Sequence, residues 1–350
     1  MSPPSTVDHE VAATISAVHP DIIGAQILTR LDGPTLASAA AASYQLHSLS
    51  REPSLWADIC RSTWPSTASP RVAEVISYFP GGHRSFFSDS FPLPVDHDRH
   101  HHGVDRDNHA AAINLDRMPE LISAVDVHYR GRLILSKVVE TETSSGWFRC
   151  SPFRVDLLHP KDVVPTEIPF PRDDDDDTCR DIAEGLTLSW IVIDPIGRRA
   201  MNLSSHKPVE VQRHWLSGEV HVRFAAVLGK QGSSSEFVQC GVQVTCGGSH
   251  FLLQVREVCL VVEDMDGTHL KGRESLVTLQ WALDGKRGKR REEEGRKRYQ
   301  EYLERKRERK ERKVRTEGTL DMLFAIFFGA FAFSLLSVGI FRGVKGIPNW

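Results

Sequence analysis

The residues best suited to chemistry in this sequence are the histidines and aspartates of one short polar stretch. The histidines of that stretch are His97, His100, His101, His102 and His109. Imidazole nitrogens bind transition metals, so these side chains could hold a metal ion transiently. A specific metal site also needs fixed geometry and outer hydrogen bonds that orient its ligands, which a polar linker rarely provides. We therefore expect residues 93–120 to form a linker with no metal site and no cofactor.

Local motifs of the common catalytic sites are absent from the chain. There is no GxSxG nucleophile elbow, no P-loop, no HExxH helix and no GxGxxG turn. The six cysteines form no CxxC pair, and so few thiols in 350 residues indicate a reducing, cytosolic compartment rather than a disulfide scaffold. We expect no catalytic residues, and we predict a protein that binds its partners without transforming them.

The middle of the chain has the period-two alternation of apolar and polar residues that is typical of β-strands. Alternation is clear over residues 125–130, 220–224 and 238–244, and continuous apolar runs occupy 133–139, 186–193, 251–262 and 276–283. About eight strands with no long helical pattern between them predict an antiparallel sandwich. We assign residues 121–284 to this β-rich domain.

The most apolar segment lies near the C-terminus. Residues 322–341 carry no charged side chain, and twelve of these twenty residues are Leu, Ile, Phe or Val. A helix of this length covers roughly 30 Å, the thickness of the hydrocarbon layer of a bilayer. Together the twelve side chains favour insertion by roughly 5 kcal/mol. A buried core helix is the alternative, but such a helix usually keeps a polar stripe. We predict a single transmembrane helix over 320–342 and a short tail over 343–350.

A basic segment precedes the predicted span. Between Lys286 and Arg315 the net charge is +9, although the whole chain carries −3. Acidic and basic residues four positions apart support a charged helix over 285–319, which lacks the apolar stripe of a coiled coil. We favour a spacer that contacts anionic lipid. A plain solvated helix and a nuclear address or nucleic-acid patch are the alternatives, and we expect no nucleic acid partner.

The charge asymmetry also predicts an orientation. Basic flanks stay on the cytoplasmic side, so the large N-terminal part should face the cytosol. Because only nine residues follow the uncharged stretch 322–341, we expect post-translational insertion of a tail-anchored protein, in the endoplasmic reticulum or a connected membrane.

Short helices are predicted for the N-terminal region. Pro20 suits the first turn of a helix, and the residues from Asp32 to Pro34 end one helix and start another. We expect a disordered segment over 1–14, four short helices over 15–65 and a helical extension over 66–92. So small a bundle carries more apolar side chains than its own core can cover, which leaves a surface for another polypeptide.

This bundle resembles the F-box. The matching positions are Pro20, Ile27-Leu28, Leu31-Asp32, Leu36, Leu49 and the final Leu55-Trp56. The family's opening leucine is replaced by His19, and the tryptophan of the third helix by Leu46. The block from Val72 to Pro92 is similar to a group of plant F-box proteins.

Members of that family bind the Skp-type adaptor, and through it cullin, of a Skp–cullin–F-box ubiquitin ligase. The resemblance implies adaptor contacts at Pro20, Ile22, Ile27, Leu28, Leu31, Leu36, Leu49, Leu55 and Trp56. We expect Leu55 and Trp56 to lie near the surface, as anchors of the interface.

Two stretches of the β-rich domain, 186–190 and 215–220, are similar to motifs of the plant phloem-lectin domain, which follows an F-box in some proteins. This similarity implies that loops at one end of the sandwich recruit a glycosylated or otherwise specific client protein. Trp147, Trp190 and Trp215 are then candidate client-binding residues. Burial in the sandwich core is their alternative role.

The sequence therefore predicts an α+β multidomain protein. Its parts are an N-terminal F-box bundle, a central antiparallel β-sandwich, a charged helix and one transmembrane helix. We expect a non-catalytic substrate-recognition subunit of a ubiquitin ligase, with the adaptor, a client and membrane lipid as partners. The alternative is a membrane-anchored lectin-like or scaffold protein without ligase activity.

Overall fold

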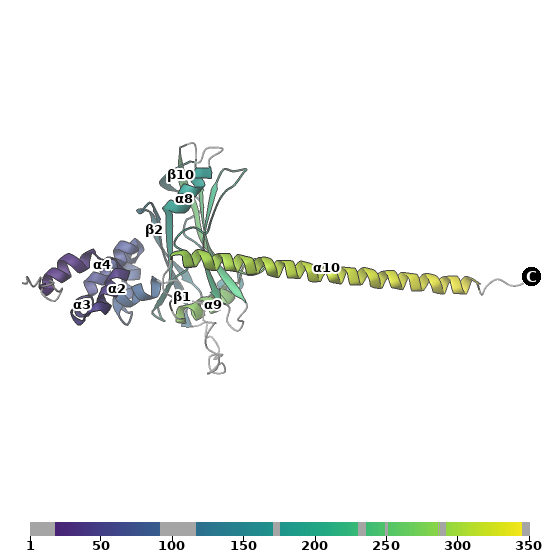
Figure 1. Ribbon diagram of the computed structural model, residues 1–350, viewed down its shortest axis with the longest axis horizontal. Helices are drawn as coiled ribbons and strands as arrows, with labels where there is room; N and C mark the ends of the chain where they lie inside the picture. The colour runs from purple at the N-terminus through teal and green to yellow at the C-terminus, as the bar shows by residue number, and fades with distance from the viewer. Residues whose placement is uncertain are drawn as a thin grey trace, which may run out of the picture.

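The computed structural model describes residues 18–91, 117–170, 176–229, 236–248, 251–285, 287 and 292–344. Short helices come first in this part of the chain, antiparallel sheets follow, and one long helix comes last (Figure 1). This order confirms the predicted succession of helices, antiparallel strands and a C-terminal apolar helix. The predicted disordered segment over 1–14 and most of the predicted linker over 93–120 lie outside the described residues.

The N-terminal helices start at residues that favour helix initiation. Prolines occupy the first turn of several of them, and the side chains of Asp32 and Ser43 accept hydrogen bonds from the backbone N–H groups of Thr35 (2.9 Å) and Leu46 (3.2 Å). The helices are α1 (Pro20–Ile22), η2 (Ile23–Ile27), η3 (Leu28–Arg30), α2 (Gly33–Ala42), α3 (Tyr44–Leu49), α4 (Pro53–Thr63), η4 (Pro65–Ala68), α5 (Pro70–Ser77) and α6 (Gly82–Ser90).

Two sheets follow, and all their strand pairs are antiparallel. The first contains β1 (Glu120–Tyr129), β2 (Arg132–Glu142), β5 (Leu186–Asp194) and β6 (Arg199–Asn202), in the order β2-β1-β5-β6. The second has the order β3-β10-β9-β8-β7, with β4 also paired to β10. Its strands are β3 (Arg154–Asp156), β4 (Val164–Pro169), β7 (Glu210–Arg213), β8 (Val220–Gly229), β9 (Phe237–Gly247) and β10 (Leu252–Asp264).

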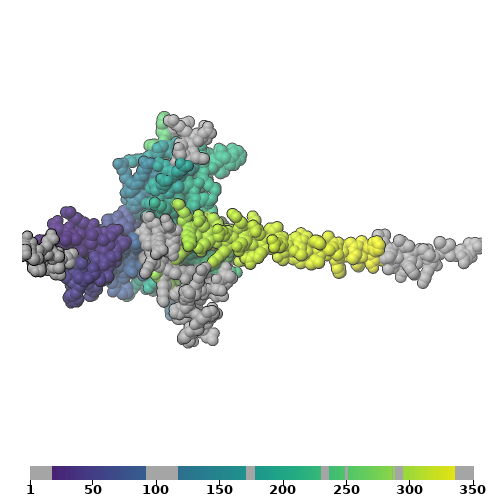
Figure 2. Space-filling model, viewed as in Figure 1, coloured from purple at the N-terminus to yellow at the C-terminus, as the bar shows by residue number. Residues whose placement is uncertain are grey.

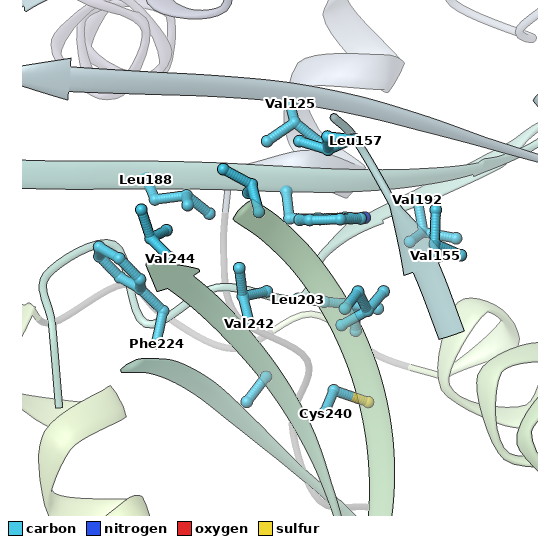
Figure 3. Close-up of a cluster of buried hydrophobic side chains, with 14 of the residues drawn as sticks. Val125, Val155, Leu157, Leu188, Val192, Leu203, Phe224, Cys240, Val242 and Val244 are labelled. Atoms are coloured by element: carbon cyan, nitrogen blue, oxygen red, sulfur yellow. The ribbon is translucent and has the colours of Figure 1, made fainter. Parts of the chain in front are cut away.

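The facing sides of the two sheets share one apolar core. Figure 3 shows Val125 and Leu188 of the four-stranded sheet opposite Phe224 and Val244 of the six-stranded sheet. Side chains alternate along each strand, so every second residue points into this core. Trp190 is one of the largest side chains buried there.

Three helices belong to the β-rich region, and one of them corrects a predicted strand. They are α7 (Gly146–Cys150), α8 (Asp176–Gly185) and α9 (Gly272–Asp284). Residues 276–283, which the apolar run predicts as a buried strand, instead form most of α9. Leu276, Leu279 and Leu283 recur with helical spacing and are all buried. A short apolar run fits a buried helix as well as a strand, which is why the prediction is wrong here.

The N-terminal helices pack directly on the outer face of the four-stranded sheet. Ile122 and Ala124 of β1 and Ile191 of β5 belong to the same buried cluster as Trp64 and Phe87. Both faces of β1 are therefore covered, one by the second sheet and one by helices. In Figure 1 the helical region adjoins the sheets on the side of β1 and β2.

The C-terminal helix α10 (Glu292–Val344) is continuous. It joins the predicted charged helix and the predicted span into one element. Near its start, Tyr299 and Tyr302 are buried with Ala225 and Met265, on the side of the six-stranded sheet that faces away from the main core. The helix then projects from the molecule (Figure 2). Among the described residues, one helix is long and apolar enough to cross a membrane, and its most apolar stretch is entirely unburied.

Candidate functional site

The predicted adaptor-binding residues divide into a buried and an accessible group. Leu28, Leu36, Leu55 and Trp56 are buried in the core that the helices share with the sheet. The remaining predicted residues reach the surface at least in part, and they are Pro20, Ile22, Ile27, Leu31 and Leu49. The structure therefore does not bring all nine residues to one surface.

The expectation that Leu55 and Trp56 lie near the surface is wrong. The Trp56 ring packs beside Phe87 of α6, with 5.5 Å between ring centroids. Its Nε1–H donates a hydrogen bond to the carbonyl oxygen of Ser50 (2.7 Å). The Trp56 ring is covered by α6, which follows the F-box-like stretch in sequence. A pattern confined to residues 20–56 contains no sign of that cover.

Three large apolar side chains of the bundle are exposed. They are Ile22 on α1, Ile27 on η2 and Tyr44 at the start of α3, and Tyr44 is 89% exposed. The first helices lie at the end of the molecule farthest from the sheets (Figure 1). The sequence pattern does not single out Tyr44, although a signal is present. Leu46 and Leu49 are three residues apart and mark the inner face of α3, so a residue two positions before Leu46 falls off that face.

Buried polar contacts hold the helical region on the sheet. The Asp126 carboxylate of β1 accepts hydrogen bonds from the Ser66 N–H (2.9 Å) and the Ser66 hydroxyl (2.5 Å). Burial raises the pKa of Asp126, and the hydrogen bonds from Ser66 and Ser136 act in the opposite direction. Nearby, the Arg71 guanidinium lies 2.8 Å from Glu120. The bundle is therefore mounted in a fixed orientation on the β-rich region.

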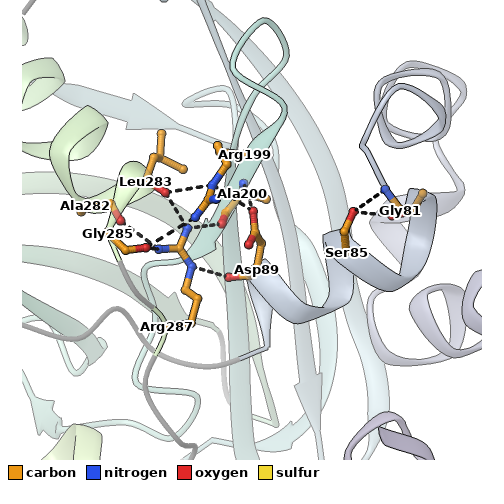
Figure 4. Close-up of polar contacts among 10 residues, drawn as sticks. Gly81, Ser85, Asp89, Arg199, Ala200, Ala282, Leu283, Gly285 and Arg287 are labelled. Atoms are coloured by element: carbon orange, nitrogen blue, oxygen red, sulfur yellow. Dashed lines mark hydrogen bonds and ion pairs between the residues drawn. The ribbon is translucent and has the colours of Figure 1, made fainter. Parts of the chain in front are cut away.

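A second polar cluster surrounds Arg287 (Figure 4). Its guanidinium donates five hydrogen bonds to backbone carbonyls, at 2.7 to 3.0 Å. The acceptors are the carbonyls of Asp89 in α6, Ala200 in β6, Ala282 and Leu283 in α9, and Gly285. Asp89 also pairs with Arg199 at 3.2 Å. We refer to Arg287 and these partners as the arginine clasp.

The arginine clasp gives Arg287 a structural role within the fold. Arg287 is half-buried in the fold, and burial lowers the pKa of its guanidinium. With its N–H groups bonded to protein carbonyls, this side chain cannot also bind a nucleic acid backbone. The other members of that basic run lie outside the described residues.

The three candidate client-binding tryptophans do not form one site. Trp190 is fully buried, and its Nε1–H donates to the Ser123 hydroxyl at 3.1 Å, so it is a core residue. Trp147 and Trp215 are 80% and 87% exposed. Trp147 belongs to α7, which packs on α9, whereas Trp215 lies in the turn before β8, next to the strand that contacts α8. Helices α8 and α9 lie at opposite ends of the sheets (Figure 1).

One cluster in the described part of the chain has the composition of a metal site. Asp156, Glu257 and Cys259 place their ligand atoms within 4.8 Å of one another. The Arg154 guanidinium already lies 2.8 Å from Asp156 and 2.5 Å from Glu257. Burial raises the pKa of Cys259 to about 11, which keeps the thiol protonated. Arg154 therefore joins both carboxylates of the cluster in ion pairs.

The basic residues at the start of α10 dock the helix on the sheet. The Arg305 guanidinium lies 4.6 Å from the Phe237 ring centroid, and Arg309 pairs with Asp266 at 3.0 Å. The Tyr302 hydroxyl donates to the Asp264 carbonyl at 3.0 Å. From 310 to 321, four basic residues are offset by three acidic ones. From 292 to 309, where α10 meets the sheet, seven basic residues are offset by six acidic ones, so neither stretch of the helix carries more than a small net positive charge.

Comparison with known proteins identifies close relatives in Arabidopsis thaliana. A probable F-box protein is 50% identical over 339 residues, which are 96% of this chain and 95% of the relative. A second F-box protein is 44% identical over 92% of this chain and 95% of its own length. A third is 45% identical over 81% of this chain and 78% of its own length. No family model and no solved structure matches the chain.

Two of these relatives align over more than nine-tenths of this chain and of their own length. Ile22, Ile27 and Tyr44, the exposed apolar side chains of the bundle, lie in the stretch that resembles the F-box. The chain belongs to the F-box protein family of plants.

Proposed function

We propose that this protein is the substrate receptor of a Skp–cullin–F-box ubiquitin ligase that works at a membrane surface. F-box proteins in general connect a client to such a ligase. In this proposal the bundle binds the Skp-type adaptor, the β-rich region binds the client, and α10 holds both at the membrane. The protein performs no chemistry itself, and it acts by raising the effective concentration of the client near the charged enzyme.

One observation carries the adaptor contact. On a chain that belongs to the F-box family, Ile22, Ile27 and Tyr44 expose apolar side chains on the first helices of the bundle. These helices lie on the side of the molecule away from the sheets (Figure 1). Large apolar and aromatic side chains that reach solvent are the usual anchors of protein interfaces. Pro20 and the half-buried Leu31 and Leu49 complete the accessible set. Leu28, Leu36, Leu55 and Trp56 support this surface from below.

The unburied apolar part of α10 supports the membrane tether. The exposed side chains of this part include Phe324, Phe327, Phe328 and Phe331. Apolar surface in contact with water is unfavourable in free energy, and a bilayer around the helix removes that contact. The bundle and α10 lie at opposite ends of the molecule (Figures 1 and 2). A bilayer around the apolar part therefore leaves the adaptor-binding end pointing into the cytosol, in keeping with the basic flank. We place the protein in the endoplasmic reticulum or a connected membrane.

Substitution of the exposed isoleucines tests the adaptor contact. In the full chain, reconstituted in lipid nanodiscs, we expect Ile22→Asp combined with Ile27→Asp to reduce capture by a purified Skp-type adaptor at least about tenfold. Both side chains are solvent-exposed, so the thermal unfolding midpoint should stay unchanged.

Ile196→Asp is the matched control, because Ile196 is exposed in the turn between β5 and β6 and is not part of the bundle. Capture of this variant should equal that of the wild type. If the adaptor captures the Ile22 and Ile27 double variant as well as it captures the wild type, the adaptor does not use this surface.

A further inference from the structure

The contact between α10 and the six-stranded sheet ends at a defined residue. Arg309 pairs with Asp266 at 3.0 Å and with Glu236 at 3.8 Å, and both partners lie in turns of that sheet. Every described residue from 310 to 335 is exposed. Packing against the sheet therefore ends at Arg309, and the helix beyond it projects away from the described strands (Figure 2).

The docked part of α10 has a fixed direction relative to the sheets. Tyr299 and Tyr302 are buried against the six-stranded sheet, and the Arg296 guanidinium donates to the Pro208 carbonyl at 3.3 Å. Just before the helix, Arg287 is held in the arginine clasp. Contacts before the helix and along its first turns thus set the direction in which α10 leaves the molecule.

Residues 310–321 continue this helix without a break. No proline occurs between 292 and 344, and proline is the commonest cause of a sharp kink. The Arg312 guanidinium lies 3.7 Å from Glu308, and the Thr316 hydroxyl donates to the Arg312 carbonyl at 2.9 Å. A short helix is marginal alone because nucleation is costly, but here the docked turns have already nucleated it. The segment is therefore expected to stay helical in water.

The charge of this segment does not draw it onto the membrane. Its four basic and three acidic residues leave a net charge of +1. Segments that lie on anionic lipid usually carry clusters of four to eight basic residues with little acidic compensation. Residues 310–321 are therefore better suited to standing away from the surface than to lying on it.

The length of the segment sets a distance. Arg309 and Met322, the first residue of the uncharged stretch, are 13 residues apart, which a helix covers in about 20 Å. A tilt of about 20°, the average for transmembrane helices, shortens this height by only about 1 Å. The headgroup layer occupies roughly 5–8 Å of it. The turn that carries Asp266 therefore stands clear of the headgroups by roughly 12–15 Å.

The adaptor-binding end is held farther away still. In Figure 1 the bundle lies on the side of the sheets opposite to the projecting part of α10. The bundle shares a buried core with β1, and α10 is docked on the other sheet, so this arrangement is set by packing. A ligase assembled on the bundle is thus separated from the bilayer by the whole β-rich region.

We propose that residues 310–321 are a rigid spacer that fixes the distance between the β-rich region and the bilayer. Clients of this receptor then have a cytosolic part that extends beyond the lipid headgroups. A protein that presents only transmembrane helices with short loops cannot reach the β-rich region. This inference rests on the proposed function as a membrane-tethered substrate receptor.

Insertion of helical heptads tests the spacer in the full chain in lipid nanodiscs. A fluorescent donor is attached at Thr268→Cys, in the turn that pairs with Arg309, and acceptors label the lipid headgroups. Cys150 and Cys179 are changed to serine, and the other four cysteines are buried. Seven helix-forming residues inserted after Thr316 should lengthen the donor-to-headgroup distance by about 10 Å, and fourteen by about 20 Å. Each heptad changes the rotation of the helix by only about 20°.

Seven glycine and serine residues inserted at the same place are the matched control. A flexible chain should broaden the distance distribution without the full shift of about 10 Å. Gly318→Ala replaces the weakest helix former of the spacer and should leave both the distance and its spread unchanged. The proposal is overturned if the helical heptad shifts the distance no more than the flexible insertion does. It is also overturned if the wild-type distribution is as broad as that of the flexible variant.

Lipid-anchored photoreactive probes test the consequence for clients. A probe whose reactive group lies within the headgroup layer should label no residue of the bundle or the β-rich region, as read by mass spectrometry. Probes that reach about 20 Å from the hydrocarbon layer should label the β-rich region. Equal labelling by the short and the long probes would overturn the proposed client class.

Failure of the spacer and failure of the tether give different results. A wild-type chain that does not enter nanodiscs would contradict the membrane attachment, and with it the proposed function. A chain that enters nanodiscs but holds its β-rich region at a variable height keeps the tether and contradicts only the rigid spacer.

Discussion

Both the apolar ring and the polar N–H group of Trp56 have partners inside the helical region. Its ring packs beside Phe87, and its N–H is bonded to the Ser50 carbonyl. An amphipathic ring with both halves satisfied in this way has no group left to offer a partner. Trp56 therefore holds α4 against α6, and it influences an adaptor only through the shape of the bundle.

Loss of this ring should destabilise the fold of the helical region, and it should not act by removing a contact with the adaptor. We expect Trp56→Ala to lower the free energy of unfolding by about 3–5 kcal/mol, because a large buried side chain is replaced by a cavity. Chemical denaturation followed by far-ultraviolet circular dichroism measures this change. Tyr44→Ala removes an exposed ring and should change stability by less than about 0.5 kcal/mol while it weakens adaptor capture. A stable, well-folded Trp56→Ala protein would contradict the assigned core position.

At the scale of elements, the arginine clasp gathers segments that are distant in the chain. The carbonyls of Ala282 and Leu283 belong to the last turn of α9, where the helix dipole is negative and attracts a cation. The same guanidinium reaches α6 and β6 through the carbonyls of Asp89 and Ala200. One side chain thus links the helical region, the first sheet and the segment that leads to α10.

Removal of the clasp should loosen all of these contacts together. We expect Arg287→Ala to reduce the free energy of unfolding by about 2–4 kcal/mol, because it leaves several enclosed carbonyls without a donor. Arg287→Lys should restore little, since an ammonium group lacks the planar fork that reaches carbonyls on several sides. Arg307→Ala is the control, because Arg307 is exposed on α10 and its loss should cost less than about 0.5 kcal/mol. Equal stability of the Arg287 and Arg307 variants would show that the clasp contributes nothing.

At the scale of the whole molecule, the two candidate binding regions of the proposed function point in opposite directions. The exposed end of the bundle and the apolar part of α10 lie at opposite ends of the long axis (Figure 1). Because α10 docks through Tyr299 and Tyr302 and the bundle shares a core with β1, these directions are set by packing. An adaptor on the bundle and a bilayer around α10, as proposed, would therefore not compete for the same surface.

The membrane attachment can be tested through two phenylalanines of α10. We expect the wild-type chain to stay in the membrane pellet after alkaline carbonate extraction, and a Phe328→Asp and Phe331→Asp double variant to move to the supernatant. Two aspartates near the middle of a span cost roughly 5–7 kcal/mol, which exceeds the roughly 5 kcal/mol that the apolar side chains contribute. Leucine at both positions is the control and should remain in the pellet. Release of the wild type by carbonate would contradict a transmembrane helix.

Local sequence was sufficient for the properties that depend on neighbours in the chain. Strand alternation, helix-starting prolines and an uncharged run of twenty residues each reflect the surroundings of one segment, so the antiparallel strands, the short helices and the apolar C-terminal helix were predicted. The same reasoning failed for residues 276–283, where a buried helix and a buried strand have similar composition.

Only the tertiary structure decided which apolar side chains are core and which are surface. Trp56 and Trp215 have the same side chain, but α6 covers the first, whereas the second lies at a turn that the described elements leave open. Arg287 holds its place because three elements, α6, β6 and the end of α9, bring their carbonyls around it. Burial depends on what packs against a residue from elsewhere in the chain, and no window of sequence contains that information.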